Sequence, residues 1–346
     1  MGHTFQTGGK LVQKAAIRAH TNIALIKYWG KRDEQEFLPM NSSLSLTLDK
    51  LYTDTFVHFD ELLKEDEFYL DEKKQDSKET EKISKFLDLF RSEANINTRA
   101  LVKSINHVPT AAGLASSASA FAALAGAANL ATGLNLDPQI LSTFARRGSG
   151  SATRSIYGGF VEWNKGTSSD DSFAIPVDDA KWDIGMVIVA VNREAKKVSS
   201  RIGMKQTVET SPFYPAWVET AETDLLAIKS AIHKKDFEKI GEITEHSAMK
   251  MHGSMLGANP PLSYFEPATM TAIRCVQELR EQGIPCYVTM DAGPNVKILC
   301  RLTQAELIKE KLNPYFQEEQ LIVTGPGKGI RELTLEEARE YDWSVE

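Results

Sequence analysis

An uncharged stretch of small residues, PTAAGLASSASAFAALAGAANLATGL at positions 109–134, constrains the fold more than any other part of the chain. Its length without a charged side chain would suit a membrane-spanning helix. Ala, Ser, Gly, Asn and Thr dominate it, however, and these residues contribute little to membrane insertion, so we expect no membrane partner. Two structures remain: a helix of small residues packed tightly in a core, or a backbone cradle for an anion. The composition favours neither.

The same stretch predicts a helix with a recognisable start and end. Ser116 or Ser117 can cap its N-terminus, and Gly133 can stop it. Phe121 and Leu124 follow at helical spacing and would share one face. The free N–H groups of the first turn and the helix dipole favour an anion, so the loop before this helix is a candidate phosphate site.

A phosphate loop at this place would differ from a Walker A loop. No GK[ST] sequence follows Gly113, so the positive charge must come from other parts of the chain. Small residues would let the backbone approach a phosphate closely, and serine hydroxyls would add donors and could bind Mg²⁺.

The overall charge argues against a nucleic-acid partner. The chain has 40 Lys and Arg against 47 Asp and Glu, which gives a net charge of -7. A nucleic-acid binder would normally show a basic surplus or stripe.

The three cysteines, Cys275, Cys286 and Cys300, form no CxxC pair, so we expect neither a disulfide framework nor a zinc site. A reducing cytoplasm suits them better.

Strand and helix signals alternate along the chain, which predicts an α+β fold. Strict alternation over residues 43–49 predicts a half-buried strand. Asp137 is a cap, Pro138 a first-turn residue and Gly148 an end for one helix. Further strands are expected at 99–108, 185–192, 286–290 and 296–302, and further helices at 215–234, 236–251 and 264–282.

The length of the chain predicts two domains, at roughly 150 residues each. We place the boundary near residue 185, which divides the chain into domains 1–185 and 186–346.

A second candidate site is RRGSGSATRS at 146–155, which combines two glycines, four hydroxyls and three arginines. Flexible backbone, hydroxyl donors and guanidinium groups suit a phosphate or a carboxylate. A polar loop whose Arg146 and Arg147 neutralise a helix C-terminus is the alternative. That alternative explains Ser149, Ser151 and Arg154 less well.

Three shorter motifs could also carry chemistry. IKYWGKRD at 26–33 places two lysines around an aromatic pair, although alone it is typical of a strand end and hairpin turn. TMDAGPNVK at 289–297 holds Asp291 in a turn between two strands, as a general base or as an ordinary turn residue. KKVSSRIGM at 196–204 is a basic, hydroxyl-rich cluster or a solvated loop.

The sequence contains no HExxH motif, no GxSxG nucleophile elbow and no metal-ligand spacing. Four histidines stand alone, and we expect each to occupy a structural position with satisfied hydrogen bonds: His20, His107, His246 and His252.

Together these motifs resemble one family. PTAAGLASSASA is similar to the phosphate loop of the GHMP small-molecule kinases. AHTNIALIKYWGKRD, RRGSGSATRSIYGGF, KKVSSR and MDAGPNVK resemble the diphosphomevalonate decarboxylases in particular, in order, over roughly residues 15–300. The resemblance implies a two-domain GHMP kinase fold, with an N-terminal part like domain 2 of ribosomal protein S5 and a C-terminal ferredoxin-like α/β sandwich. It also implies a cytoplasmic homodimer.

The resemblance further implies an ATP-dependent carboxy-lyase of the mevalonate pathway. Mevalonate 5-diphosphate would be converted to isopentenyl diphosphate, carbon dioxide, ADP and phosphate, with Mg²⁺ required. Asp291 would accept or orient the proton of the 3-hydroxyl, and Arg154 would clamp the carboxylate. Lys196 would reach the transferring phosphate, with Lys197 as the alternative.

The binding residues implied by the resemblance fall into two groups. The substrate, through its diphosphate and carboxylate, would contact Tyr28, Lys31, Ser149, Gly150, Ser151, Arg154, Arg201 and the backbone of Met204. The ATP phosphates would lie on Ala112, Gly113, Leu114, Ala115, Ser116, Ser117 and Ser119, and the hydroxyl of Ser117 would bind Mg²⁺.

Two rival functions deserve a test. A related kinase could phosphorylate a mevalonate-type 3-hydroxyl without decarboxylation, but such a protein would be expected to alter KYWGK or the Asp of MDAGP, and both are intact. A non-enzymatic nucleotide or RNA binder could share the fold, because fold alone does not fix function. The acidic net charge and Asp291 argue against it.

Overall fold

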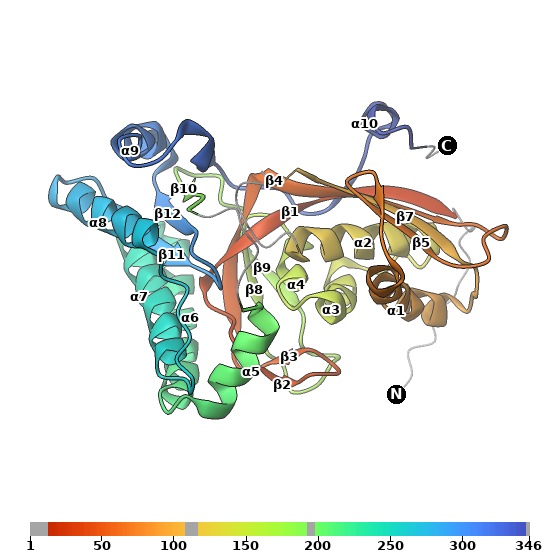
Figure 1. The fold of residues 1–346 in the computed structure, drawn as a ribbon, viewed down its shortest axis with the longest axis horizontal. Coiled ribbons are helices and arrows are strands. Elements are labelled where there is room, and N and C mark those ends of the chain that lie inside the picture. The colour runs from red at the N-terminus through yellow and green to blue at the C-terminus, as the bar shows by residue number, and fades with distance from the viewer. Residues whose placement is uncertain (1–12, 108–116, 192–197, 344–346) are drawn as a thin grey trace.

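Two β-sheets and the helices packed on them make up the structure, a computed structural model that describes residues 13–107, 117–191 and 198–343 (Figure 1). The larger sheet contains β1 (Lys14–Ile26), β4 (Ser43–Phe59), β5 (Glu67–Leu70), β6 (Lys73–Lys74), β7 (Ala100–His107), β8 (Phe160–Trp163), β9 (Ala174–Asp178) and β14 (Arg331–Glu332). Its order is β14-β1-β4-β7-β5-β6, and β8 pairs with β4 and β9. All of its pairs are antiparallel except the parallel pair of β5 and β7.

The smaller sheet is antiparallel throughout and has the order β11-β12-β10-β13. Its strands are β10 (Gly185–Val189), β11 (Cys286–Met290), β12 (Val296–Cys300) and β13 (Leu321–Thr324). A separate hairpin consists of β2 (Lys31–Asp33) and β3 (Leu38–Pro39).

Helices cover both sheets (Figure 1). The larger sheet packs against α1 (Ser77–Ala94), α2 (Ser117–Ala131), α3 (Pro138–Gly148) and the short α4 (Ala152–Ser155). The remaining helices are α5 (Ser200–Thr210), α6 (Tyr214–Lys234), α7 (Phe237–Leu256), α8 (Pro267–Glu281), α9 (Ala305–Leu312) and α10 (Leu335–Glu340). Among the helices of the described residues, none has the length and apolar content needed to cross a lipid bilayer.

The predicted helix boundaries are largely confirmed. The carboxylate of Asp137 accepts hydrogen bonds from two backbone N–H groups at the start of α3, as expected of an N-cap. Gly133 has a φ of 71° just after α2, which is the left-handed conformation expected of a helix stop. The long helical patterns correspond to α6, α7 and α8.

Residues 43–49 belong to strand β4, as predicted, but the prediction that they are half-buried is wrong. Ser45 and Thr47, the polar residues of the alternating pattern, are both fully buried. The hydroxyl of Thr47 donates to the carbonyl of Tyr157 over 3.1 Å, so a loop of the same domain covers this face of the strand. Leu44 and Leu46 are buried on the opposite face.

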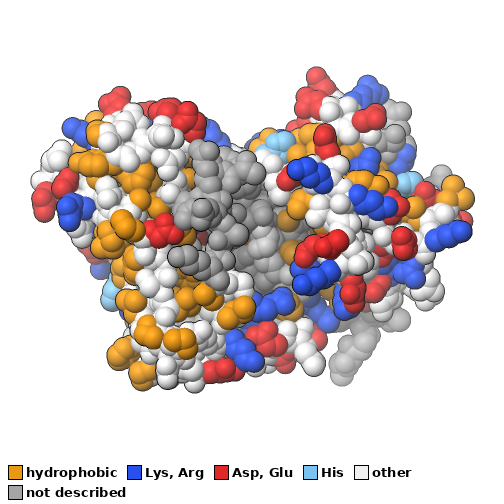
Figure 2. Space-filling view, in the orientation of Figure 1, with side chains coloured by type: hydrophobic (Ala, Val, Ile, Leu, Met, Phe, Trp, Pro, Cys, Tyr) orange, Lys and Arg blue, Asp and Glu red, His pale blue; other side chains and the backbone are white. Residues whose placement is uncertain are grey.

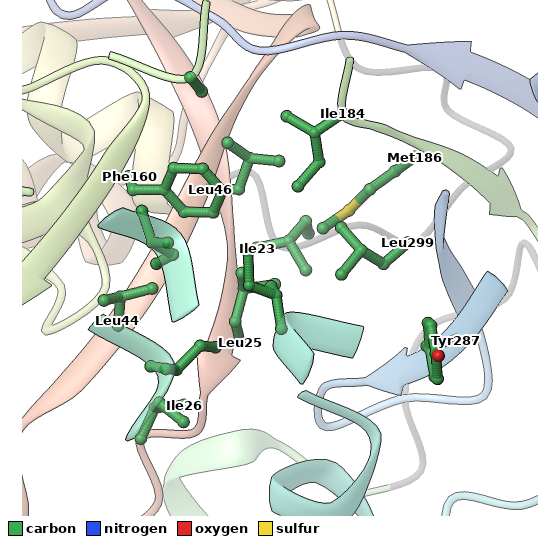
Figure 3. Packing of buried hydrophobic residues seen from close by; sticks show 14 of the residues in the cluster. Ile23, Leu25, Ile26, Leu44, Leu46, Phe160, Ile184, Met186, Tyr287 and Leu299 are labelled. Carbon is green, nitrogen blue, oxygen red and sulfur yellow. The ribbon is translucent and has the colours of Figure 1, made fainter. Parts of the chain in front are cut away.

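The two sheets share a hydrophobic core (Figure 3). Ile23 and Leu46 enter it from the larger sheet, and Met186 and Leu299 enter it from the smaller one. Helices α6 and α7 close this core with a row of apolar side chains: Leu225, Ile228, Ile232, Phe237, Ile240 and Ile243. The halves of the molecule are therefore held together by apolar burial, the main favourable term in folding.

The C-terminal part of the chain returns to the larger sheet. Strand β14 pairs with β1, with Glu332 opposite Ile17. Trp343 stacks on Phe56 with ring centroids 5.8 Å apart, on the face away from α2. The division of the chain at residue 185 stays a prediction, and residues 331–343 pack with the larger sheet.

Candidate active site

A cavity of about 340 Å³ lies where segments far apart in the sequence converge. Figure 2 shows Lys and Arg side chains grouped over α5 and the β2–β3 hairpin. The lining comes from the end of β1, the start of α2, the α3–α4 junction, the start of α5 and the turn after β11. It includes these sequence-predicted residues: Tyr28, Lys31, Ser117, Ser149, Gly150, Ser151, Arg154, Arg201, Met204 and Asp291.

Two lysines hold the Asp291 carboxylate. Lys27 Nζ lies 2.8 Å from Oδ1, and Lys297 Nζ lies 3.0 Å from Oδ2. The side chains of the lysines are 1% and 5% exposed, whereas that of Asp291 is 33% exposed. The carboxylate therefore reaches the cavity, whose lining also includes Lys27, whereas Lys297 lies outside that lining.

These ion pairs set the protonation states. Burial alone would raise the pKa of Asp291, but the ammonium groups of Lys27 and Lys297 outweigh it and hold that pKa well below its usual range. Burial lowers the pKa of Lys27 to about 8, against the attraction of Asp291. Asp291 is thus a carboxylate at any physiological pH.

The turn that carries Asp291 is anchored on both sides. The backbone N–H of Gly293 donates to the Asp291 carbonyl over 2.9 Å. The Thr269 hydroxyl donates to the Pro294 carbonyl over 2.8 Å, which ties the turn to α8. The side-chain oxygen of Asn295 accepts from the backbone N–H of Val191, two residues after β10, over 2.8 Å. The direction of the carboxylate is therefore fixed by the backbone as well as by the lysines.

Arg154 lies on α4 and is only 2% exposed. Its Nε donates to Oδ1 of Asn22 over 3.2 Å, and its Nη1 donates to Oγ of Ser43 over 2.6 Å. Asn22 is held in turn by its own bond to the Ser155 hydroxyl. Burial lowers the pKa of Arg154 to about 10, so the group remains charged at neutral pH. An anchored guanidinium that borders the cavity can bind a carboxylate with two parallel hydrogen bonds.

A second group of cations lies near the β2–β3 hairpin. Lys31 Nζ forms an ion pair with Glu34 at 2.8 Å and lies 4.0 Å from the centroid of the Phe37 ring. The guanidinium of Arg201 lies 5.9 Å from the same ring. Arg201 and Met204 belong to α5, which Ser199 caps, so the 196–204 motif is partly helical and not simply a solvated loop.

Gly150 permits a close approach of side chains. A Cβ at this position would lie 2.9 Å from the hydroxyl of Tyr28 and 2.9 Å from the ring of Trp163. Those two rings meet edge to face with centroids 4.8 Å apart. The neighbouring hydroxyls of Ser149 and Ser151 are 3.2 Å apart and line the cavity. Only glycine fits between these groups.

The predicted nucleotide loop is described only at its end. Ser117 begins α2, is exposed and lines the cavity. The hydroxyl of Ser119 is buried, 3.2 Å from that of Thr21 and 2.8 Å from that of Thr53, and it does not line the cavity. The other predicted residues lie outside the described part of the chain: Ala112, Gly113, Leu114, Ala115, Ser116, and both Lys196 and Lys197.

The described residues contain no group of three His, Cys, Asp or Glu side chains that could hold a metal ion. The hydroxyl of Ser117 is exposed at the start of α2. Mg²⁺ usually takes few protein ligands beside its substrate phosphates.

Sequence reasoning missed Lys27, Lys297 and Asn22. Both lysines lie inside motifs that had been singled out, but neither was given a role. A signal existed for Lys297: a lysine within an otherwise apolar strand must be neutralised, and the short turn before that strand carries a carboxylate.

The expectation that the lone histidines are satisfied is wrong for two of them. His20 Nδ1 and His252 Nε2 are buried with no hydrogen-bond partner among the described residues. Burial lowers the pKa of each of these two histidines to about 4. His107, in contrast, bonds the hydroxyl of Tyr341 at 2.8 Å.

Comparisons with known proteins match both parts of the chain to the same enzyme family. Residues 19–174 match the family model of the diphosphomevalonate decarboxylase-like N-terminal domain. Residues 186–341 match that of the mevalonate 5-diphosphate decarboxylase C-terminal domain. The diphosphomevalonate decarboxylase of Candida albicans is 37% identical over 301 residues, which cover 82% of this chain and 83% of the relative.

Solved structures are similar over nearly the whole chain. MDDEF in complex with MVAPP, AMPPCP and magnesium is 52% identical with a TM-score of 0.89, covering 93% of this chain and 99% of that one. Mevalonate diphosphate decarboxylase from Staphylococcus aureus is 48% identical with a TM-score of 0.90, covering 93% of this chain and 98% of that one.

Proposed function

The chain belongs to the diphosphomevalonate decarboxylase family, and from that premise we propose how its cavity converts mevalonate 5-diphosphate and ATP to isopentenyl diphosphate, carbon dioxide, ADP and phosphate. The α+β fold of the GHMP kinase type agrees with the solved relatives, one of which contains MVAPP, a nucleotide analogue and magnesium. The observation that carries the proposal is the Asp291 carboxylate held between Lys27 and Lys297 in a cavity that Arg154 also lines.

Phosphoryl transfer to the 3-hydroxyl is the first chemical task. The Asp291 carboxylate orients the hydroxyl by accepting its hydrogen bond. Because two ammonium groups keep the pKa of Asp291 low, it is a weak base toward a free alcohol. The hydroxyl becomes more acidic as its oxygen bonds to phosphorus, and Asp291 accepts the proton at that stage. General-base help of this kind typically contributes about 10²- to 10⁴-fold.

Loss of phosphate and carbon dioxide is the second task. The C3–O bond breaks, positive charge develops at C3, and the electrons of the C1–C2 bond form the new double bond as carbon dioxide leaves. Arg154 holds the C1 carboxylate so that the C1–C2 bond can align with the departing phosphate. The proton that Asp291 accepted passes to an oxygen of the departing phosphate, which restores the carboxylate. Its negative charge then favours the developing positive charge, which is electrostatic stabilisation by a preorganised group.

The diphosphate of the substrate is bound by the opposite side of the cavity. We assign this role to Tyr28, Lys31, Arg201, the Ser149-Gly150-Ser151 segment and the backbone of Met204. Two observations support the assignment. Lys31 and Arg201 flank one aromatic ring, so both charges are aimed at the same region. The start of α5 also lines the cavity, and a helix N-terminus favours an anion.

Residues 112–116 and Ser117 are proposed to bind the ATP phosphates, and the Ser117 hydroxyl to hold Mg²⁺. When bound, Mg²⁺ neutralises negative charge on the transferring phosphate. A phosphate contact by Lys196, or by Lys197, and one by Ser119 stay predictions.

We also propose a cytoplasmic homodimer with a domain boundary near residue 185. The three cysteines are buried free thiols, which suits a reducing compartment. The two family matches end at residue 174 and begin at residue 186, which supports the boundary.

One assay tests the reaction. Purified protein, Mg-ATP and mevalonate 5-diphosphate labelled at C1 are mixed, and ADP and labelled carbon dioxide are followed together. We expect equal amounts of both. ADP without carbon dioxide would instead identify a kinase that stops at the phosphorylated alcohol. If neither product forms while ATP still binds, the proposal fails and the protein is a nucleotide binder.

A further inference from the structure

Phe37 places an aromatic ring beside two of the cations assigned to the diphosphate. Lys31 Nζ lies 4.0 Å from the centroid of the Phe37 ring, and the guanidinium of Arg201 lies 5.9 Å from it. All three residues line the cavity. The face of an aromatic ring carries partial negative charge and attracts a cation within about 6 Å of its centroid. The ring therefore attracts two groups whose own charges repel each other.

The Lys31 ammonium also has an anionic partner, which differs from the ring in one important respect. Lys31 forms an ion pair with Glu34 at 2.8 Å, and its side chain is 6% exposed whereas that of Glu34 is 62% exposed. A carboxylate neutralises the ammonium and competes with a phosphate for its N–H donors. An aromatic ring has no net charge, so it can hold the ammonium while the positive charge stays available to an anion.

The backbone of Phe37 is fixed in an uncommon conformation. Its φ is 54°, in the left-handed region that bulky side chains rarely adopt. Such a conformation persists only where the surrounding structure enforces it. Here the carboxylate of Asp33 accepts hydrogen bonds from the backbone N–H groups of Gln35 and Glu36, over 2.8 and 2.7 Å. These bonds shape the turn of the β2–β3 hairpin just before Phe37.

A buried arginine anchors the same turn to the rest of the protein. Arg146 on α3 is fully buried, and its Nε donates to the Glu36 carbonyl over 3.0 Å. Its Nη1 donates to the Ser169 carbonyl over 3.0 Å, and the Ser169 hydroxyl donates to the Glu36 carboxylate over 2.8 Å. Because Glu36 is bonded directly to Phe37, these contacts fix the backbone from which the ring extends.

We propose that Phe37 is a positioning residue for the diphosphate site: its ring holds the Lys31 ammonium, and more weakly the Arg201 guanidinium, where both bind the diphosphate of the substrate. Cations that are already ordered lose less conformational freedom when the ligand binds, so the affinity for the diphosphate increases. This inference deepens the proposed function and rests on it for the identity of the ligand.

Two substitutions separate the aromatic face from the apolar volume of the side chain. Phe37→Leu keeps an apolar side chain and removes the aromatic face, whereas Phe37→Tyr keeps the face. Tyr69→Leu is the matched control. It removes a ring whose centroid lies 5.9 Å from Lys74 Nζ, on strand β5, which is not part of the described lining of the cavity.

We expect Phe37→Leu to raise the KM for mevalonate 5-diphosphate about fivefold, which is typical of the loss of one cation–π contact. Its kcat should stay within a factor of about 2 of the wild type and its KM for ATP should not change, because the ring acts on binding of the diphosphate alone. Phe37→Tyr and Tyr69→Leu should resemble the wild type in all three constants. The inference is overturned if Phe37→Leu keeps the wild-type KM, or if its kcat and its KM for ATP change as much as its KM for the substrate.

Inorganic diphosphate is a probe that requires no turnover. Its Kd is measured by calorimetry for the wild type, Phe37→Leu, Lys31→Met and the double variant. Phe37→Leu should weaken binding about fivefold when Lys31 is present and less than about twofold when it is replaced. Equal effects in both backgrounds would overturn the inference, because the ring would then act without Lys31. Failure of the wild-type protein to release carbon dioxide would refute the proposed function, while this coupling would still be measurable.

A measurement on the unmodified protein does not depend on variant folding. A ring close to the Lys31 ammonium shifts the NMR signals of the neighbouring methylene protons upfield. In ¹³C-labelled protein, the Lys31 Hε signals should be upfield of those of other lysines and should remain so when inorganic diphosphate is added. Lys31 Hε signals at their ordinary position in the presence of diphosphate would overturn the inference.

Discussion

Removing the Lys297 ammonium tests whether Asp291 needs both of its lysines. Lys297 Nζ lies 3.0 Å from Oδ2, and Lys27 Nζ lies 2.8 Å from Oδ1. Lys297→Met puts an uncharged chain of similar length into a site that is 5% exposed. Oδ2 then loses its counter-ion, while Oδ1 keeps its own.

The expected loss of stability follows from the burial of the pair. Removing one partner of a fully buried ion pair costs about 3–5 kcal/mol. Asp291 keeps one lysine and is 33% exposed, so we expect about 1–2 kcal/mol, close to one charge-assisted hydrogen bond. The folded-state pKa of Asp291 lies below its unfolded value. The deficit is therefore complete above the unfolded pKa of about 4 and shrinks as the pH falls below it.

The same substitution should change the catalytic pH profile. Without Lys297, the pKa of Asp291 rises toward its usual range, so the acid limb of kcat/KM moves to higher pH. Loss of orientation at Oδ2 should lower kcat roughly tenfold, which corresponds to about 1.4 kcal/mol.

Release of ADP and carbon dioxide is measured from pH 5 to pH 9, together with urea unfolding at neutral pH. Lys85→Met is the control, at a position where the lysine side chain is 73% exposed. It should change neither the catalytic pH profile nor the free energy of unfolding. A Lys297→Met protein with the wild-type pH profile, kcat and unfolding free energy would refute this reading of the site.

Three further predictions follow from the same geometry. Arg154→Lys should lower kcat/KM by roughly 100-fold in steady-state assays, because a lysine cannot form paired hydrogen bonds to a carboxylate while it is anchored on two side chains. Glu34→Gln should lower KM for the diphosphate substrate about two- to fivefold, because it frees Lys31 from an exposed ion pair; an unchanged KM would argue against Lys31 as a diphosphate ligand. His20 and His252 should make the protein less stable as the pH falls from about 6.5 toward 4, by at most about 3 kcal/mol each. Their folded pKa values are lowered to about 4, so the unfolded chain binds more protons in this range, and His252→Asn should flatten the decline in urea midpoints.

Elements whose signals lie within their own sequence could be predicted. Helix α3 begins at its Asp137 cap, and β11 and β12 flank the DAGPN turn as expected. Turns and helix caps depend on a few neighbouring residues, so they can be predicted from one sequence. The family motifs could also be assigned to one site, and Tyr28, Arg154 and Asp291 do line one cavity.

Contacts made only by packing could not be predicted. Lys27 and Asp291 are 264 residues apart and meet because the end of β1 lies against the β11–β12 hairpin. The alternation in β4 could not reveal that its polar face is covered. Ser45 and Thr47 give the same alternating pattern whether they are exposed to solvent or packed against the loop before β8. A local pattern reports the periodicity of an element and leaves open what packs on it.

The cavity reconciles an acidic protein with two polyanionic substrates. Among the described residues that line it, Lys27, Lys31, Arg154 and Arg201 are cations and only Asp291 is an anion, although the whole chain has a net charge of -7. Burial lowers the pKa of Lys27 to about 8 and that of Arg154 to about 10, so folding bears the cost of keeping these charges from water. Phosphate and carboxylate groups that enter the cavity offset that cost. Part of the binding free energy therefore comes from neutralising the excess positive charge that folding has brought together in the cavity. The long-range electrostatic field of the whole protein contributes little to binding.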